Sequence, residues 1–210
     1  AQTTSGIFSP EQRNRVEKLL LGYGENTAPH LRPIYGYLSP TDAGFGELTK
    51  DLHGYGNVSF KLKSSVRSRV FMCADDSYMA VNLETETTNV IPSSLHQTRA
   101  HSYYYTRERN PLDVLKAGKE GLGQSFQFVE AQITGGVGLA DVEAVTFREE
   151  ALFRKYKQAL AEKGLRAELT DMAGTKIQTV YGPAELQAEK AAAAALRSDN
   201  TVVGRLKQLV

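Results

Sequence analysis

The sequence predicts an α+β fold, in which helices near both ends of the chain flank a region of short strands. Three observations favour this class. The segment from Pro10 to about Gly22 or Gly24 and the segment 149–163 carry apolar side chains at helical spacing. Residues 31–145 consist of short apolar and aromatic runs separated by Gly, Pro, Asn and Ser, which is typical of strands and turns. From Pro183 onward an Ala-rich tail with few large apolar residues predicts a further helix.

Composition excludes several classes of protein. The chain has 210 residues, 25 Lys and Arg against 24 Asp and Glu, and a single cysteine, Cys73. One cysteine excludes an internal disulfide framework and a Cys-rich zinc site. The near-neutral charge gives no overall field toward nucleic acid or acidic lipid, and no apolar run approaches the roughly 20 residues of a membrane span. Because the first residue is Ala, we expect an excised domain or a processed product.

The first helix has a complete start signal. Ser9 suits the cap position, Pro10 the first helical position, and Gln12 the third residue of a capping box. Gly22 or Gly24 is expected to end the helix. Three residues supply its apolar face: Val16, Leu19 and Leu20.

Six strands are predicted in the middle of the chain. Within residues 57–63, Val58, Phe60 and Leu62 alternate with polar residues, which indicates a half-buried strand. Between residues 83 and 125 the pattern is weaker, with a short helix near 112–117 and a mobile loop at 121–125. The expected strands are 32–38, 57–63, 69–73, 78–82, 126–133 and 144–147.

After the strands, residues 149–163 form the clearest helix, which Gly164 is expected to end. Residues 165–169 and 176–180 are predicted as two further edge strands. The final helix, which begins at Pro183, is expected to dock only lightly because it has little large apolar surface.

Common catalytic motifs are absent from the sequence: it has no glycine-rich nucleotide loop, no Gly-x-Ser-x-Gly and no His-Glu-x-x-His. The four His are not spaced as a metal set, and His101 is interpreted as a loop residue. Short separated motifs remain, and they run in the order RPIYGYL at 32–38, YGNVSFKLK at 55–63, VRSRVF at 66–71 leading to DDS at 75–77, and FVEAQI at 128–133 followed by GGV at 135–137.

In this order the motifs resemble the mono-ADP-ribosyltransferase superfamily of the Arg-Ser-Glu type, and within it the branch found in phage head-morphogenesis proteins and bacterial polymorphic toxins. The resemblance covers about residues 30–165. It implies a split, mainly antiparallel β-sheet with an NAD cleft and flanking helices. The expected organisation is an N-terminal helical segment at 1–29, a catalytic core at 30–165 and a C-terminal strand and helix extension at 166–210.

The resemblance implies a role for each motif. A guanidinium at Arg32 would hold the NAD pyrophosphate by charge-assisted hydrogen bonds. A carboxylate at Glu130 would stabilise the positive charge that develops on the ribose as nicotinamide leaves. A serine would orient the site, and an aromatic ring would stack on nicotinamide. The implied catalytic residues are Glu130, Ser77 and Ser59, and the implied NAD-binding residues are Arg32, Tyr35, Gly36 and Ser59, with no metal. The basic residues between Lys61 and Arg69 would suit the NAD phosphates or an acidic target, or form a solvated face.

The implied function is transfer of ADP-ribose from NAD to a protein or RNA, with NAD hydrolysis as a side activity. Phe128 stands two residues before Glu130, where relatives carry Glu or Gln, so the target residue stays open. We expect an antibacterial or effector toxin that is secreted or delivered, acts in the target-cell cytoplasm and has an immunity protein as partner. No membrane partner is expected.

Two other classes stay open. The first is a phage head-associated structural or DNA-packaging module without turnover. The second is a nuclease toxin, which the lack of an acid and His cluster disfavours. Residues 99–109, with three Tyr and three Arg, are interpreted either as a grip on nucleic acid or a protein target, or as a half-buried loop.

Overall fold

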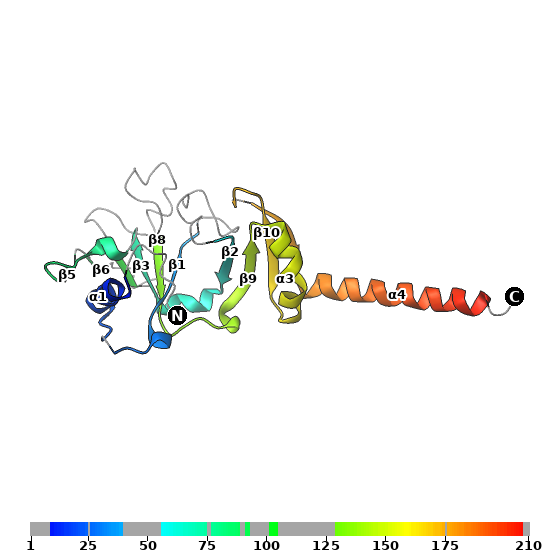
Figure 1. The fold of residues 1–210 in the computed structure, drawn as a ribbon, viewed down its shortest axis with the longest axis horizontal. Coiled ribbons are helices and arrows are strands. Elements are labelled where there is room, and N and C mark those ends of the chain that lie inside the picture. Colours follow the sequence, from blue (N-terminus) through cyan, green and yellow to red (C-terminus); the bar gives the residue numbers. More distant parts are fainter. Residues whose placement is uncertain are drawn as a thin grey trace.

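The computed structural model describes residues 9–24, 26–39, 56–74, 77–88, 91–92, 101–104, 129–174 and 176–207. Within these residues the fold is mixed α and β, with mostly antiparallel sheets, so the predicted class is confirmed at that level. Two sheets lie side by side between helix α1 at one end and helix α3 at the other (Figure 1). The predicted short helix at 112–117 and loop at 121–125 lie outside the described residues.

Helix α1, Pro10–Leu21, follows the predicted start and end signals. The Ser9 hydroxyl accepts a hydrogen bond from the backbone N–H of Gln12, and the side-chain carbonyl of Gln12 accepts one from the backbone N–H of Ser9. These two bonds complete the capping box. Gly22 ends the helix in the left-handed conformation, with φ of 71°. Val16 and Leu20 are buried against Val81, so this helix has its own small apolar core.

The first sheet has five strands in the order β1-β8-β3-β7-β6. Strand β8 lies between β1 and β3 and is antiparallel to both. All five residues of β8 are buried, as expected for a central strand covered on both faces. The strands are β1 at Ile34–Tyr37, β3 at Val70–Ala74, β6 at Ile91–Pro92, β7 at His101–Tyr104 and β8 at Val129–Ile133.

The second sheet has four strands in the order β11-β10-β9-β2. Strands β9 and β10 are parallel, and helix α3, Glu150–Glu162, connects them and covers one face of the sheet. Phe153 on α3 packs edge-on against Phe147 of β9, with ring centroids 6.3 Å apart. The strands are β2 at Val58–Leu62, β9 at Val142–Phe147, β10 at Arg166–Thr170 and β11 at Ile177–Tyr181.

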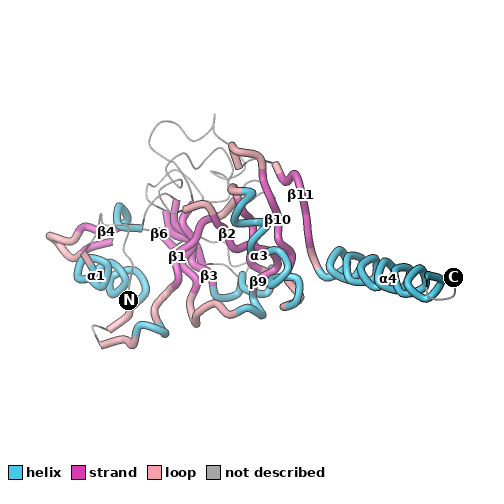
Figure 2. Tube along the Cα trace, turned by 45° about the vertical axis from the view of Figure 1, so that its right-hand side comes forward, coloured by secondary structure: helices cyan, strands magenta, loops and turns pink. Residues whose placement is uncertain are grey.

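Two small elements and four short 3-10 turns complete the described fold. Strands β4, Val81–Asn82, and β5, Thr87–Thr88, form a hairpin beside α1 (Figure 2). The 3-10 turns lie at Pro29–Leu31, Ser64–Arg69, Ser77–Ala80 and Leu139–Asp141.

Four sequence predictions were wrong in detail. Residues 77–80 form a 3-10 turn rather than a strand, so only Val81–Asn82 is extended. Strand β10 is internal rather than at an edge, because β11 pairs with its outer side. His101 begins strand β7 and is not a loop residue. Phe60 was predicted on the buried face of β2 with Val58 and Leu62; those two are half-buried, but Phe60 is 59% exposed.

Helix α4, Pro183–Lys207, projects away from both sheets (Figure 1). Leu186 in its first turn is buried against the α3 core, whereas residues 187–197 are exposed. The prediction of a lightly docked C-terminal helix is therefore confirmed. No helix among the described residues is both long enough and apolar enough to cross a membrane.

Candidate functional site

The centre of the candidate site is Glu130 on the middle strand of the five-stranded sheet. Glu130 is 5% exposed and Gln132 is 1% exposed. Because they lie two residues apart on β8, their side chains leave the same face of the strand. The Gln132 amide Nε2 donates a hydrogen bond of 2.9 Å to Glu130 Oε1. A buried carboxylate and a buried amide are thus paired on this face.

Two tyrosines of β1 stand opposite this pair. The register places Tyr37 across from Glu130 and Tyr35 across from Gln132, and cross-strand partners share a face. Gly36 lies between the tyrosines and therefore belongs to the other face, where a side-chain carbon at its position would meet Ile133 Cδ1 at 3.8 Å. The structure thus groups both tyrosines with Glu130 and separates Gly36 from them.

The predicted strand 32–38 included Arg32, but the observed strand β1 begins at Ile34. Arg32 follows the 3-10 turn Pro29–Leu31 and precedes β1. Its guanidinium is buried, with 7% of the side chain exposed. The Nη1 atom donates to Glu17 Oε2 over 2.8 Å and also to Asn14 Oδ1. The Nε atom donates to the Thr27 carbonyl over 3.2 Å. In this structure the charge of Arg32 is therefore compensated by Glu17 of helix α1.

Glu17 also connects α1 to the strand beside Glu130. The Tyr35 hydroxyl donates to Glu17 Oε1 over 3.0 Å, so both carboxylate oxygens of this 2% exposed side chain are hydrogen-bonded. Burial raises the pKa of Tyr35 well above its usual range, the charge of Arg13 opposes this rise, and the charges of Glu17 and Glu130 add to it. Tyr35 therefore stays protonated and acts as a hydrogen-bond donor.

Arg13 brings Ser77 into the same group. Its guanidinium carbon lies 4.4 Å from the centroid of the Tyr35 ring, which is cation–π distance. Its Nη1 donates to Ser77 Oγ over 3.3 Å, and Ser77 is fully buried. Ser77 begins the 3-10 turn Ser77–Ala80 rather than ending a strand.

Ser59 reaches the site from the second sheet. It lies on β2 and forms a side-chain hydrogen bond with Tyr37. Burial raises the pKa of Tyr37, whereas the bond with Ser59 and the charge of Arg148 lower it. The strand register places Tyr37 across from Glu130, so Ser59 contacts the cross-strand neighbour of the carboxylate-bearing residue.

The turn that follows β8 is held by a network around Arg69. Gly135 and Gly136 have φ of 76° and 75°, a left-handed backbone conformation that residues other than glycine rarely adopt. Arg69 Nη1 donates to the carbonyls of Thr134, over 3.0 Å, and Gly136. Arg69 Nη2 lies 2.8 Å from Asp141 Oδ1. A backbone bond from Gly138, together with this contact from Arg69, holds the pKa of Asp141 below its usual range.

The cationic segment between Lys61 and Arg69 has protein partners in the structure. Lys63 Nζ donates to the Ala140 carbonyl over 2.8 Å, and Lys61 Nζ lies 3.9 Å from Glu143 Oε1. The Lys61 and Lys63 contacts lie within the second sheet and the turn that precedes β9, whereas the Arg69–Asp141 contact connects that turn to the first sheet. Their contacts are structural, so the sequence interpretation of this segment as a phosphate site gains no support from them.

Of the predicted site residues, Arg32, Tyr35 and Ser77 are connected through Glu17 and Arg13. The charge of Glu130 acts on Tyr35, and Ser59 bonds to Tyr37, whereas Gly36 belongs to the other face of β1. Sequence reasoning missed the residues that connect them. Gln132 carried a signal, because a spacing of two places it on the face of Glu130. Arg13 and Glu17 are four residues apart and so share a face of the predicted first helix, but only the fold shows that this face meets β1. The residues that sequence reasoning missed are Arg13, Asn14, Glu17, Tyr37 and Gln132.

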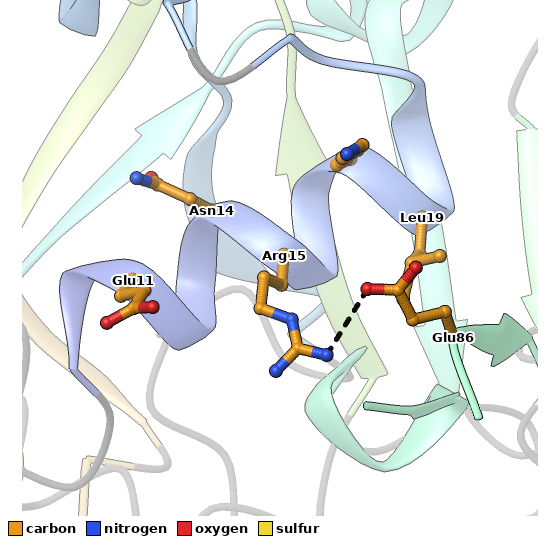
Figure 3. Close-up of a pocket in the computed structure, with 6 residues that line it drawn as sticks. Glu11, Asn14, Arg15, Leu19 and Glu86 are labelled. Carbon is orange, nitrogen blue, oxygen red and sulfur yellow. Dashed lines mark hydrogen bonds and ion pairs between the residues drawn. The ribbon is translucent and has the colours of Figure 1, made fainter. Parts of the chain in front are cut away.

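A surface pocket lies beside α1 and the turn that joins β4 and β5, and it shares Asn14 with the site group (Figure 3). Its volume is about 330 Å³. Arg15 Nη2 lies 3.4 Å from Glu86 Oε1 across the pocket and also donates to the Leu83 carbonyl. None of the predicted site residues lines it. The lining residues are Glu11, Asn14, Arg15, Lys18, Leu19 and Glu86.

Among residues 9–207 that the structure describes, no group of three or more His, Cys, Asp and Glu side chains is arranged to hold a metal ion. Comparisons of the chain with protein-family models, with curated proteins and with solved structures find no match.

Proposed function

We propose that this protein transfers ADP-ribose from NAD to a macromolecular acceptor, with Glu130 as the catalytic carboxylate. The observation that carries the proposal is the pairing of Glu130 with Gln132 on β8, opposite the two tyrosines of β1. A carboxylate is costly to bury unless its neighbours compensate it. The arrangement supports a role for Glu130 beyond packing.

The proposed reaction breaks the bond between C1′ of the nicotinamide ribose and the pyridinium nitrogen. Nicotinamide leaves with the bonding electron pair and becomes neutral, while positive charge develops on the ribose. The Glu130 carboxylate stabilises this charge and accepts a hydrogen bond from the ribose hydroxyl. An acceptor nucleophile then bonds to C1′ and loses a proton, and water as acceptor gives hydrolysis of NAD instead.

The chain also has groups that suit the other parts of NAD. Arg13 and Arg32 carry guanidinium groups, which bind pyrophosphate by charge-assisted hydrogen bonds. Tyr35 has an aromatic ring that suits stacking on nicotinamide. Arg32 reaches phosphate only if it exchanges the Glu17 carboxylate for the phosphate oxygens, because its charge is paired with Glu17 at 2.8 Å. Ser77 and Ser59 orient Arg13 and Tyr37 respectively.

The biological setting that we propose is an antibacterial or effector toxin, secreted or delivered into a target cell. Its acceptor is a protein or an RNA, and an immunity protein neutralises it. This setting rests on the resemblance of the motifs at residues 32–38, 55–63, 66–77 and 128–137 to such transferases.

The test is transfer of a labelled ADP-ribose group from biotinylated NAD to the macromolecules of a bacterial lysate. The wild-type protein is expected to label one or a few bands, and Glu130→Gln is expected to label none. The control variant Glu143→Gln replaces a half-exposed carboxylate on β9 and should keep wild-type labelling. Protease and RNase treatment of the labelled material identifies the class of acceptor. Equal labelling by the wild type and Glu130→Gln would contradict the proposal.

The second candidate function is a phage head-associated structural or DNA-packaging module without turnover. One observation favours it: Arg32 and Glu17 are both buried and satisfy each other, as in a purely structural ion pair. Under this alternative the wild-type protein neither consumes NAD nor binds it, and Glu130 contributes only to stability.

A further inference from the structure

We propose that Gln132 is the positioning residue of this site, and that its amide holds the Glu130 carboxylate in the orientation that the reaction needs. The inference rests on the proposed function. It identifies Gln132 as the polar support of the carboxylate, in a chain that has Phe128 two positions before Glu130.

The strand geometry allows the residue two positions after Glu130 to support it, because residues two apart on a β-strand share a face. Gln132 takes this position on β8, and its Nε2 donates to Glu130 Oε1 over 2.9 Å. The amide therefore reaches the carboxylate from the C-terminal side.

Gln132 is itself held on both sides. Strand β8 lies between β1 and β3, and the register places Tyr35 and Phe71 across from Gln132. Its side chain is 1% exposed, so it lies in packed surroundings that restrict its rotamers. A supporting group fixes a catalytic carboxylate only when its own side chain is immobile, and these aromatic neighbours meet that condition.

The chemistry favours an amide at this position over a second acid. An N–H donor stabilises the ionised carboxylate without adding charge. A glutamate in place of Gln132 would set two carboxylates at hydrogen-bond distance, and like charges this close cannot both ionise easily, so the pair would retain a proton to higher pH. A protonated Glu130 stabilises a developing positive charge poorly.

The test compares NAD turnover of the wild type with Gln132→Met, which keeps the side-chain length without the donor, and with Gln132→Glu. We expect Gln132→Met to lower kcat by about 10- to 100-fold, the range for a lost hydrogen bond to a charged group. The KM for NAD should stay within about twofold, because the bond acts on the reacting centre rather than on binding. In Gln132→Glu, the acidic limb of the pH–rate profile should move to higher pH by about one pH unit.

Matched controls are Gln178→Met and Gln178→Glu, which alter an exposed glutamine on the outer strand β11. Both should keep the wild-type kcat and pH profile. The proposal is overturned if Gln132→Met retains the wild-type kcat and the profile of Gln132→Glu does not move, or if the Gln178 variants show the same changes. If Gln132→Met does not fold, Gln132→Asn replaces it in the test. Asparagine keeps a polar amide at this position, but its shorter side chain moves the N–H donor away from the Glu130 carboxylate.

A second readout separates this inference from the proposed function. The carboxyl carbon of Glu130, labelled with ¹³C, is titrated by NMR in the wild type and in Gln132→Met. The carboxylate should protonate at higher pH in Gln132→Met, because a donor to the ionised form is lost. Coincident titration curves would overturn the positioning role, whether or not the protein turns over NAD. A wild-type protein that leaves NAD unchanged would overturn the proposed function instead.

Discussion

The Arg32 guanidinium and the Glu17 carboxylate meet at 2.8 Å, and fewer than a tenth of either side chain is exposed. This pair joins helix α1 to the segment just before β1, and the Tyr35 hydroxyl donates a hydrogen bond to the other carboxylate oxygen of Glu17. The residue that resembles the phosphate-binding arginine of ADP-ribosyltransferases therefore also anchors the first helix. Any ligand that binds Arg32 must compete with Glu17.

The pair predicts a large loss of stability when Glu17 alone is removed. In Glu17→Ala the buried Arg32 loses its counter-charge, so the free energy of unfolding should fall by about 3–5 kcal/mol. Urea denaturation followed by circular dichroism measures the change. The control Glu11→Ala removes an exposed carboxylate from the same helix and should change stability by less than about 0.5 kcal/mol. A similar small effect for both variants would show that the pair does not anchor α1.

The contacts of Asp141 predict a dependence of stability on pH. Its pKa is lowered in the folded protein by the Gly138 amide and by Arg69. A carboxylate with a lowered folded pKa stabilises the fold above its unfolded pKa of about 3.9, and this contribution is lost as pH falls through the folded value. Wild-type stability should therefore fall below about pH 4, and Asp141→Asn should show a weaker fall.

Urea midpoints measured between pH 2.5 and pH 7 test this prediction. Glu84→Gln, which replaces an exposed carboxylate in the turn between β4 and β5, serves as the control and should follow the wild-type curve. Parallel curves for Asp141→Asn and the wild type would contradict the role of the Arg69 network.

The exposure of residues 187–197 in helix α4 predicts that the part of the helix after Lys190 is dispensable for the fold. A chain that ends after Lys190 keeps the buried Leu186 and the bond of 2.7 Å between the Tyr181 hydroxyl and Glu189 Oε2. Its free energy of unfolding should lie within about 0.5 kcal/mol of the full chain. Leu186→Ala in the full chain should cost about 2–5 kcal/mol, because it opens a cavity beside the α3 core. A large loss on truncation would show that the distal part of α4 has a stabilising contact.

Local signals in the sequence were sufficient to predict the helices. Ser9 and Gln12 form the capping box that they indicate, and Gly164 follows α3 with φ of 77°. Most longer strands were also predicted, but residues 77–80 form a 3-10 turn, which a short apolar run fits as well as a strand. Strands β5, β6 and β7 were not predicted, because the apolar pattern between residues 83 and 125 is weak. The role of β10 as an internal strand depends on pairing with β11, and no local pattern encodes which neighbour a strand takes.

The candidate site was predictable in its residue types and not in its connections. Glu130 was conspicuous as a carboxylate within an apolar strand. Glu17 gave no such sign, since a charged residue on a helix is usually exposed, and its burial depends on Arg32, which is 15 residues away in the sequence. The link from Ser59 to Tyr37 joins two sheets, so it follows only from the way the sheets meet.

The most direct test of the account is release of nicotinamide from NAD, measured by chromatography, for the wild type, Glu130→Gln and the control Glu143→Gln. We expect release by the wild type and by Glu143→Gln, and a reduction of at least about 100-fold in Glu130→Gln, since removing a group that stabilises transition-state charge costs about this much. Circular dichroism should show that all three proteins are folded. No release by the folded wild-type protein, in the presence or absence of lysate, or full activity in folded Glu130→Gln, would contradict the account.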